Sequence, residues 1–218
     1  MSNRAVLLTG GWMHPTSQSQ ALVDLLQRRF DAVEVIDDPA QVADALNPAL
    51  DLLVVNACWF AMTDERYTDE QRKMHAVVLD QAAAPAIESV LSTGVPMLAL
   101  HTAVLCFDGW QPWVEAVGAS WDWATSFHPP PAEVTVEPTG TSPLLTDSFT
   151  LVDEEYQQLT LADTAAIAAR SHNGHPLVWT TEHGPGRVAV NLLGHGPVSL
   201  ENPAHRDLLD RLVRWLQI

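Results

Sequence analysis

Short runs of consecutive apolar residues alternate along the chain with segments in which apolar residues recur every three or four positions. The runs indicate strands that are buried on both faces, and the wider spacing indicates amphipathic helices. The first part of the chain predicts strands over Arg4 to Gly10, Ala32 to Ile36 and Leu50 to Asn56, separated by helices from about Gln18 to Arg29 and from Gln41 to Leu46. This order is typical of an α/β fold with a doubly wound, mostly parallel sheet and helices on both faces.

The apolar run from Val95 to Leu100 ends abruptly at His101, and a second apolar segment with wider spacing follows without a Gly or Pro. This pattern predicts a central strand, a sharp turn that carries His101, and a helix that extends to about Val117. Ligands of open α/β sheets bind in the crevice beyond the carboxyl ends of the strands. We therefore expect His101 to lie at the functional edge of the sheet.

The remaining periodic segments predict further regular elements. They are a long helix from about Asp69 to Leu91 with a break near Pro85, strands over Ala165 to Arg170, Pro176 to Thr181 and Arg187 to Leu193, and a final helix from about Pro203 to Leu216. No internal repeat or long linker divides the chain, so residues 1–218 are expected to form a single domain.

The segment from Trp121 to Pro143 departs from this pattern, since it is rich in Trp, Pro, Thr and Ser and only Glu133 to Glu137 alternates like an exposed strand. Consecutive prolines oppose regular strand pairing, which predicts an irregular insertion on the surface. Irregular segments of this kind are often functional loops. We therefore expect the insertion to cover part of the crevice and to bring His128 into it.

Composition narrows the class of protein. Apolar residues make up 47% of the 218 residues, which is enough for a substantial core. Lys and Arg number 11 against 27 Asp and Glu, a net charge of 11 − 27 = −16, so neither a nucleic-acid backbone nor an anionic membrane surface is an expected partner.

Membrane spans and disulfides are not expected either. No segment approaches the roughly 20 apolar residues that span a bilayer, and the N-terminus has too short an apolar run for a signal peptide. Cys58 and Cys106 both lie in apolar sequence, which is typical of buried, reduced thiols. These features predict a cytoplasmic protein.

Three histidines follow apolar strand candidates, namely His14, His101 and His195. If the three strands are parallel, the imidazoles lie at one edge of the sheet and form a shared site, although a single His at a strand end is usually structural. A strand end also supplies Asp153 and Glu154. The other histidines considered have no convergent partner and are expected to be solvated; they are His75, His172, His175 and His205.

Two kinds of chemistry fit these residues. In an acid/base site, His101 and His195 would transfer protons with Asp153 or Glu154 as carboxylate partner. In a metal site, zinc would be bound among His14, His101, His128 and His195, but the sequence has no HExxH motif or short-spaced ligand pair. No cofactor is therefore expected, and a divalent metal such as zinc remains the alternative.

Further residues are candidates for substrate binding. Trp12 and Trp179 lie near a candidate histidine or a strand end and could stack on a sugar, with core packing as the alternative for each. Arg187 opens a strand after a tight turn, and its alternative is an exposed hairpin arginine. The candidates for substrate binding are thus His14, Trp12, His128, Trp179 and Arg187.

An ordered set of short motifs spans residues 10 to 195 and resembles the trehalose-utilisation (ThuA-like) family. The motifs are Gly10-Gly11-Trp12-Met13-His14, Leu100-His101-Thr102-Ala103, Phe127-His128-Pro129, Asp153-Glu154-Glu155-Tyr156, Pro176 with Trp179, Gly184-Pro185-Gly186-Arg187-Val188 and Leu193-Gly194-His195. The resemblance implies a flavodoxin-like, class I glutamine amidotransferase-like fold and a role in the metabolism of trehalose or oxidised disaccharides.

The sequence departs from a working glutamine amidotransferase in two places. Such an enzyme needs a Cys at the strand-to-helix turn, where this chain has His101, and a late His-x-Glu pair, where it reads His195-Gly196-Pro197. Cys106 follows more than one helical turn after His101 and cannot take the place of the missing nucleophile. The resemblance thus implies the amidotransferase-like fold but not glutaminase activity.

Three functions remain open. The first is an enzyme of isomerase, lyase or hydrolase type that acts on a small carbohydrate or keto-sugar through His and carboxylate acid/base chemistry. The second is a non-catalytic carbohydrate-binding or regulatory protein on an amidotransferase scaffold, and the third is a metal-dependent hydrolase. The partner expected in each case is a small carbohydrate, and a homo-oligomer is compatible with the sequence.

Overall fold

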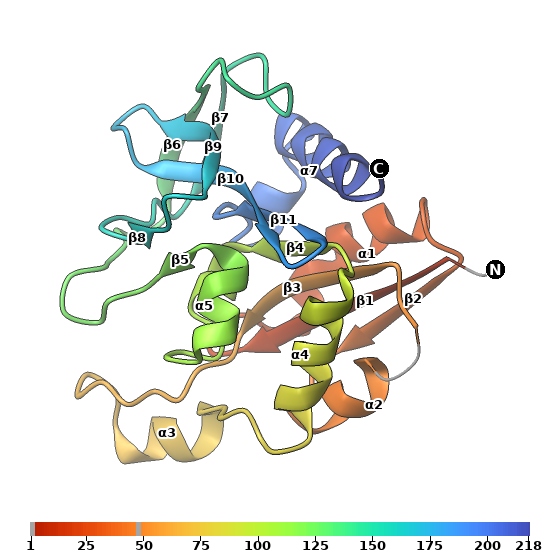
Figure 1. The fold of residues 1–218 in the computed structure, drawn as a ribbon. Helices are drawn as coiled ribbons and strands as arrows, with labels where there is room; N and C mark the ends of the chain where they lie inside the picture. Colours follow the sequence, from red (N-terminus) through yellow and green to blue (C-terminus); the bar gives the residue numbers. More distant parts are fainter. Residues whose placement is uncertain (1–2, 47–48) are drawn as a thin grey trace.

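A nine-stranded sheet forms the centre of the molecule in the computed structural model, which describes residues 3–46 and 49–218 (Figure 1). The strand order is β2-β1-β3-β4-β11-β10-β9-β6-β7, and β5 and β8 form a separate two-stranded ribbon. The strands are β1 (Arg4–Gly11), β2 (Ala32–Ile36), β3 (Leu52–Cys58), β4 (Met97–Leu100), β5 (Ala119–Ser120), β6 (Ala132–Pro138), β7 (Phe149–Asp153), β8 (Thr160–Leu161), β9 (Ala166–Ser171), β10 (Pro176–His183) and β11 (Gly186–Asn191).

The strands β2, β1, β3, β4 and β11 pair in parallel, and they form the doubly wound half of the sheet. The continuous apolar runs of β1, β3 and β4 are buried on both faces, as a central parallel strand requires, whereas the edge strand β2 is largely exposed. The α/β fold class that the sequence predicts is therefore confirmed.

The helices lie on both faces of this sheet (Figure 1). They are α1 (Gln20–Gln27), α2 (Val42–Leu46), α3 (Asp69–His75), α4 (Ala83–Thr93), α5 (Gln111–Val117), α6 (Pro197–Leu200) and α7 (Pro203–Leu216). Apolar side chains of α2, α4 and α5 pack into one core cluster, and those of α1, α6 and α7 pack into the other. The two clusters take alternate residues of each central strand, since successive side chains of a strand point to opposite faces.

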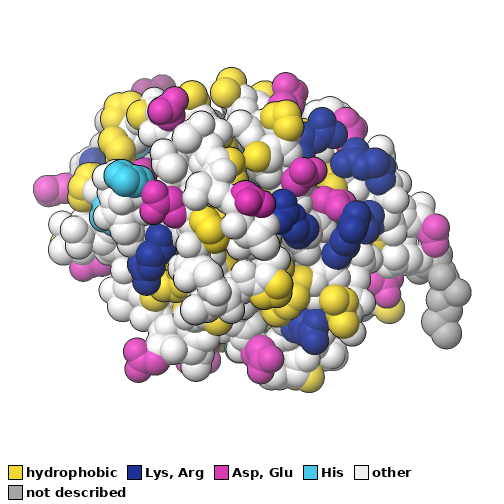
Figure 2. Space-filling model, turned by 90° about the horizontal axis from the view of Figure 1, so that it is seen from above, with side chains coloured by type: hydrophobic (Ala, Val, Ile, Leu, Met, Phe, Trp, Pro, Cys, Tyr) yellow, Lys and Arg dark blue, Asp and Glu magenta, His cyan; other side chains and the backbone are white. Residues whose placement is uncertain are grey.

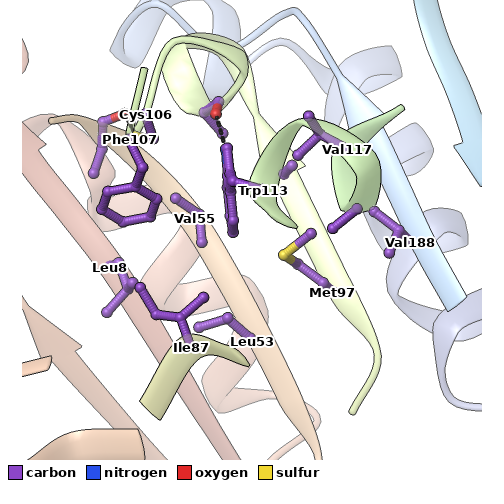
Figure 3. Close-up of a cluster of buried hydrophobic side chains, with 14 of the residues drawn as sticks. Leu8, Leu53, Val55, Ile87, Met97, Cys106, Phe107, Trp113, Val117 and Val188 are labelled. Carbon is purple, nitrogen blue, oxygen red and sulfur yellow. Dashed lines mark hydrogen bonds between the residues drawn. The ribbon is translucent and has the colours of Figure 1, made fainter. Parts of the chain in front are cut away.

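Figure 3 shows part of the first core cluster, in which Ile87 of α4 and Trp113 of α5 face Leu53, Val55 and other strand residues. Trp113 is 1% exposed, and its indole N–H donates a 2.8 Å hydrogen bond to the carbonyl of Ala103. A buried indole needs such a partner. This bond fixes α5 against the turn that follows β4, which carries His101.

The predicted helix from Asp69 to Leu91 is two helices, and the break precedes Pro85. The side chain of Thr68 caps α3 in a capping box with Gln71, and α3 ends at His75. The second helix is preceded by Asp80, whose carboxylate accepts hydrogen bonds from the backbone N–H groups of Ala82 and Ala83. Pro85 then falls in the first turn of α4, where a missing N–H is harmless.

The sheet continues beyond β11 through an antiparallel half that the sequence did not predict. Each of the steps β11 to β10, β10 to β9, β9 to β6 and β6 to β7 reverses the strand direction. After these four reversals β7 runs in the same direction as β11. The end of β7, at Asp153, therefore lies at the same edge as the ends of the parallel strands.

The prediction that residues 121–143 form an irregular surface insertion is wrong for its second part. Strand β6 pairs with β7 on one side and with β9 on the other, so Ala132 to Pro138 belong to the main sheet. Pro138 is the last residue of β6, where a proline is tolerated. The stretch from Trp121 to Pro131 lies outside the main sheet, and so do residues 139–143, which begin the connection from β6 to β7.

Charges of both signs occupy the surface despite the net charge of −16. Figure 2 shows acidic and basic side chains interspersed on the face that is seen from above. Among the described residues, no helix combines the length and apolar character that crossing a membrane requires.

The prediction that His205 is solvated is wrong, because this residue of α7 is 0% exposed. Its Nδ1–H donates to the carbonyl of Ser199 over 2.9 Å, and its Nε2 accepts from the side-chain amide of Asn191, also over 2.9 Å. The neutral ring thus satisfies both nitrogens. Burial lowers the pKa of His205, because the charged form of the ring would lose its hydration in the core.

We expect His205 to make the protein less stable in acid. Because the pKa of His205 is lower in the folded state than the unfolded value of 6.5, its stabilising contribution is complete above pH 6.5 and is lost as the pH falls below it. Urea unfolding at pH 7.5 and pH 5.5 should show a smaller loss of unfolding free energy for His205→Leu than for the wild type, although the variant is less stable at both. A matched control is His172→Gln at an exposed position where Glu137 raises the pKa, so its removal should not reduce the acid loss. An equal acid loss in wild type and His205→Leu would contradict this account.

Candidate functional site

His101 occupies a strained turn at the carboxyl end of β4. Its φ of +49° is in the left-handed region that non-glycine residues seldom adopt, and the 3₁₀ turn His101–Val104 follows at once. The hydroxyl of Thr102 donates to the carbonyl of Ala57 over 2.7 Å and ties the turn to β3. Strained backbone of this kind is concentrated at functional sites.

His14 is brought to the same edge by the loop after β1. Gly11 has a φ of +104°, and a Cβ at this position would lie 2.3 Å from the carbonyl oxygen of Cys58, so only glycine fits. The N–H of Trp12 donates to that carbonyl over 3.3 Å. The close approach of the loop to the end of β3 directs His14 toward His101, and their ring centroids are 5.1 Å apart.

Asp153 positions the loop that carries His195. Its buried carboxylate accepts backbone N–H bonds from Gly194 (2.7 Å) and His195 (3.3 Å), and the hydroxyl of Ser199 donates to it as well. The carboxylate also accepts the N–H of Glu154 over 2.7 Å. With four donors around it and a side chain that is only 1% exposed, Asp153 joins β7 to the loop after β11.

The three strand-end histidines meet, as their placement in the sequence predicts. One ring nitrogen from each of His14, His101 and His195 lies within 4.8 Å of the other two. His101 is fully buried and His14 is 8% exposed, whereas the side chain of His195 is 32% exposed. A shared cluster with one face open to solvent is thus present at the carboxyl edge.

Glu154 lies in the middle of this cluster. Its carboxylate oxygens are 3.4 Å from Nε2 of His101, 3.4 Å from Nδ1 of His195 and 3.3 Å from Nδ1 of His128. The connection that includes His128 therefore reaches the site. Tyr156 is adjacent, with its hydroxyl 3.4 Å from Nε2 of His101 and its ring 5.1 Å from that of His128.

The surroundings shift the pKa values of these groups in different directions. Burial and then the neighbouring His101 lower the pKa of His14 from 6.5 to about 4. Burial would raise the pKa of Glu154, but hydrogen bonds with His101 and His195 outweigh it and hold that pKa well below its usual value. The bond with Glu154 raises the pKa of His195 against the effect of burial. Perturbations in both directions within one cluster are typical of functional sites.

A cavity of about 290 Å³ opens beside the cluster. Its polar wall includes His14, Glu154 and His195. Aromatic rings form much of the remainder: Trp12, Phe60, Tyr67, Trp121, Trp123, Phe127 and Tyr156. Several of these rings contact one another, and the guanidinium of Arg66 lies 5.5 Å from the centre of the Trp123 ring. An apolar cavity with a few convergent polar groups has the character of a small-molecule site.

Two residues predicted to bind substrate, Trp179 and Arg187, lie away from the cavity, and the carboxylate of Asp153, a predicted acid/base residue, is taken up by structural hydrogen bonds. Trp179 is 0% exposed in the core beneath α5, and its indole N–H donates to the carbonyl of Val117. Arg187 is at the amino end of β11, where it contacts the ring and the carbonyl of Trp215. Asp153, a candidate acid/base residue, has its carboxylate occupied by the backbone and by Ser199.

Several residues of the site were missed by sequence reasoning. Tyr156 lies two positions after Glu154. In an extended segment after a strand, residues two apart point to the same side, so this spacing could have indicated that Tyr156 lies beside Glu154. Phe60 and Tyr67 lie in the loop after β3, which the sequence presents as a polar connection. Nothing local marks Trp121, Trp123 or Phe127 as cavity residues, because their inward orientation depends on the antiparallel half of the sheet.

The thiols are buried and unpaired, as predicted. Cys106 is 1% exposed, and burial raises its pKa to about 12 while its S–H donates to the carbonyl of Ala57. Burial also raises the pKa of Cys58, which lines the cavity but is 4% exposed. Neither thiol is at the strained turn, which His101 occupies.

Comparison with protein families identifies the chain. The model of the family described as trehalose utilisation, ThuA, matches residues 4–216. The chain belongs to the ThuA family. The resemblance that the ordered motifs indicate is thereby confirmed, and no match is found among curated proteins.

Solved structures share the fold at low sequence identity. A ThuA-like protein from Parabacteroides merdae has a TM-score of 0.75 at 16% identity, with 100% of this chain and 90% of that one covered. A cytoplasmic protein from Salmonella typhimurium LT2 gives 0.68 at 12% identity over 99% and 100% of the two chains. A glutamine amidotransferase from Thermotoga maritima gives 0.62 at 12% identity over 100% and 99%. The amidotransferase-like fold of this ThuA protein is thus shown.

We expect no glutaminase activity from this fold. An acyl intermediate on a thiol needs an accessible, activated thiolate beside a base, and Cys106 is buried with a raised pKa. Incubation with glutamine should release no ammonia above the blank. Ellman's reagent should label neither thiol rapidly in the native protein and both in guanidinium, which controls for the thiol content. Glutamine turnover that Cys106→Ser abolishes would contradict this expectation.

Proposed function

We propose that this ThuA protein is an enzyme that transfers protons on a small sugar or keto-sugar bound in the aromatic cavity. One observation carries the proposal: the Glu154 carboxylate lines a cavity of about 290 Å³ and lies within 3.4 Å of ring nitrogens of His101, His128 and His195. A carboxylate and imidazoles in mutual reach are the equipment of general acid/base catalysis.

The walls of the cavity support a carbohydrate as the substrate class. Sugar rings present apolar C–H faces together with hydroxyl edges, and aromatic rings bind such faces while polar groups bind the edges. Here Trp12, Trp123 and Phe127 are among the aromatic residues that line the cavity, and His14, His128 and Glu154 are among the polar ones. The volume of about 290 Å³ is at the small end of ligand pockets and suits one or two sugar rings.

The proposed reaction begins at a carbon next to a carbonyl. Glu154 takes the proton from that carbon, the C–H bonding pair becomes part of an enediol, and an imidazole such as His195 donates a proton to the carbonyl oxygen. Return of a proton to the neighbouring carbon gives an isomer, and loss of an oxygen substituent gives an elimination product. The name of the family, trehalose utilisation, supports a disaccharide-derived substrate.

The second candidate is a carbohydrate-binding protein without catalysis, which the aromatic walls support equally well. Proton exchange at carbon separates the two candidates, because binding alone does not labilise a C–H bond. We also propose a cytoplasmic location, which is supported by the similarity to a protein described as cytoplasmic in Salmonella typhimurium.

Glu154→Gln should abolish proton transfer. Keto-disaccharides and their parent sugars, trehalose included, are incubated with the protein in D₂O, and exchange of the proton beside the carbonyl is followed by NMR. We expect loss of exchange by at least about 100-fold, since general bases contribute 10²–10⁴. Glu155→Gln is the matched control, because the adjacent carboxylate accepts from Gln157 and Asn173 outside the cavity. Exchange that survives Glu154→Gln, or an absence of exchange with every sugar while one binds, would rule out this role.

Phe127→Ala should weaken sugar binding without unfolding the protein. The ring is 48% exposed and lines the cavity, while the backbone of Phe127 bridges to Gln157 and remains in the variant. Loss of one stacked ring should lower affinity roughly tenfold, which corresponds to about 1.4 kcal/mol. Calorimetric titration with the best-bound sugar checks this. Met74→Ala, at a 61% exposed position on α3 outside the cavity, should leave the affinity unchanged. An unchanged affinity in Phe127→Ala would show that the sugar does not contact this wall.

A further inference from the structure

The tautomers of two histidines at the site are fixed by the backbone. Nδ1 of His14 is 2.8 Å from the carbonyl oxygen of Trp12, and Nδ1 of His101 is 2.9 Å from that of Leu192. A carbonyl oxygen only accepts, so each Nδ1 carries the proton in the neutral ring. In the neutral rings, Nε2 of His14 and Nε2 of His101 therefore each present a lone pair to the space between the rings.

The third histidine brings another ring nitrogen to the same space. Nδ1 of His195 is 3.3 Å from Nε2 of His101, and the three inward nitrogens lie within 4.8 Å of one another. The contacts that Nε2 of His101 makes with His195, Tyr156 and Glu154 are 3.3–3.4 Å long, beyond the usual 2.7–3.2 Å of a hydrogen bond. Lone pairs that converge beside a carboxylate repel one another and the carboxylate, so a positive charge between them would stabilise the arrangement.

A proton does not satisfy this arrangement. If His195 is protonated at Nδ1, the N–H can be directed to His101 or to Glu154, and Nε2 of His14 still gains nothing. That nitrogen is buried and has no hydrogen-bond partner among the described residues. A cation at the point where the three lone pairs converge would satisfy all three nitrogens together.

We propose that His14, His101 and His195 bind one divalent transition-metal ion of the zinc type, with Glu154 beside it. Imidazole nitrogen is a ligand that zinc and its neighbours prefer, and three protein ligands with an open position are typical of catalytic zinc. The hydrogen bonds from Nδ1–H of His14 and His101 to backbone carbonyls are the outer contacts that orient metal-binding imidazoles. His128 is not part of the set, since its Nδ1 faces Pro129 and Glu154.

The distances fit a tetrahedral site after a small movement. Bonds of about 2.1 Å place two nitrogens roughly 3.4 Å apart around a tetrahedral ion, and the 3.3 Å pair of His101 and His195 already has this spacing. His14 lies on the loop after β1, outside the regular strands, and a shift of this loop would close the remaining distance, which is at most 4.8 Å.

The metal site adds to the proposed function. It depends on that proposal only for which substrate oxygen the ion would contact. When bound, such an ion polarises a carbonyl or hydroxyl oxygen as a Lewis acid. Glu154 keeps its role as the base, because its carboxylate lies beside the cluster and faces the cavity. The ion would then polarise the carbonyl oxygen in place of the proton that the proposed reaction takes from His195.

Titration of chelator-treated full-length protein with Co²⁺ and Zn²⁺ tests the site without any sugar. We expect one ion per chain, a visible Co²⁺ spectrum of low-coordinate, nitrogen-bound cobalt that Zn²⁺ displaces, and a rise of several degrees in the unfolding temperature with Zn²⁺. Mg²⁺, which prefers oxygen ligands, is the control ion and should give neither effect.

Variants assign the ion to these residues. His14→Ala and His195→Ala should lower the affinity for Zn²⁺ by at least about 100-fold, whereas His128→Ala and His75→Ala should retain it. Far-UV circular dichroism checks that each variant is folded, and His195, whose side chain is 32% exposed, is the most exposed of the three ligands. The inference would be overturned if neither Co²⁺ nor Zn²⁺ bound to the wild type, or if His14→Ala and His195→Ala both bound Zn²⁺ as tightly as the wild type does.

The two proposals can fail separately. If the ion binds as described while no sugar exchanges its proton in D₂O, the metal site stands and the proposed reaction falls. If exchange proceeds at an undiminished rate in protein that a chelator keeps free of metal, the reaction stands and the role of the ion falls.

Discussion

A buried carboxylate holds the functional edge of the sheet together. Asp153 ends β7, the outermost strand, yet it accepts hydrogen bonds from Gly194 and His195 in the loop after β11, a strand in the middle of the sheet. A carboxylate removed from water is costly unless donors surround it, so this pairing fixes both segments at once. The contact thus brings together two segments whose strands are separated in the sheet by β10, β9 and β6. The positions of Glu154 and His195 both follow from this one contact.

The sequence allowed the parallel half of the fold and the central histidines to be predicted, for a clear physical reason. Strands that are buried on both faces have continuous apolar sequences, and the carboxyl ends of parallel strands lie at one edge of the sheet. His14, His101 and His195 follow three such runs, so their meeting depends on topology alone. No side-chain detail was needed to expect it.

Other features could not be predicted because they depend on contacts between distant segments. The alternation in β6 indicated an exposed strand, but its pairing with both β7 and β9 is decided by how the sheet extends past β11. Trp179 had the local features of a cavity residue, and α5 packs over it instead. For His205, the decisive partners are Asn191 and Ser199, which come from another strand and another helix.

The strained turn at His101 has a consequence for how the candidate site relates to folding. The residues around the cavity come from six separate stretches of chain, from Trp12 to His195, and none of these stretches contains a complete binding surface. Bringing them together requires that nearly every loop of the protein be closed, which is an entropic cost that only the fully assembled sheet offsets. A left-handed His101 is maintained only by this assembly, so a proteolytic fragment that lacked either half of the sheet would lose the site altogether. Binding of a ligand at this site therefore reports that both halves of the sheet are folded.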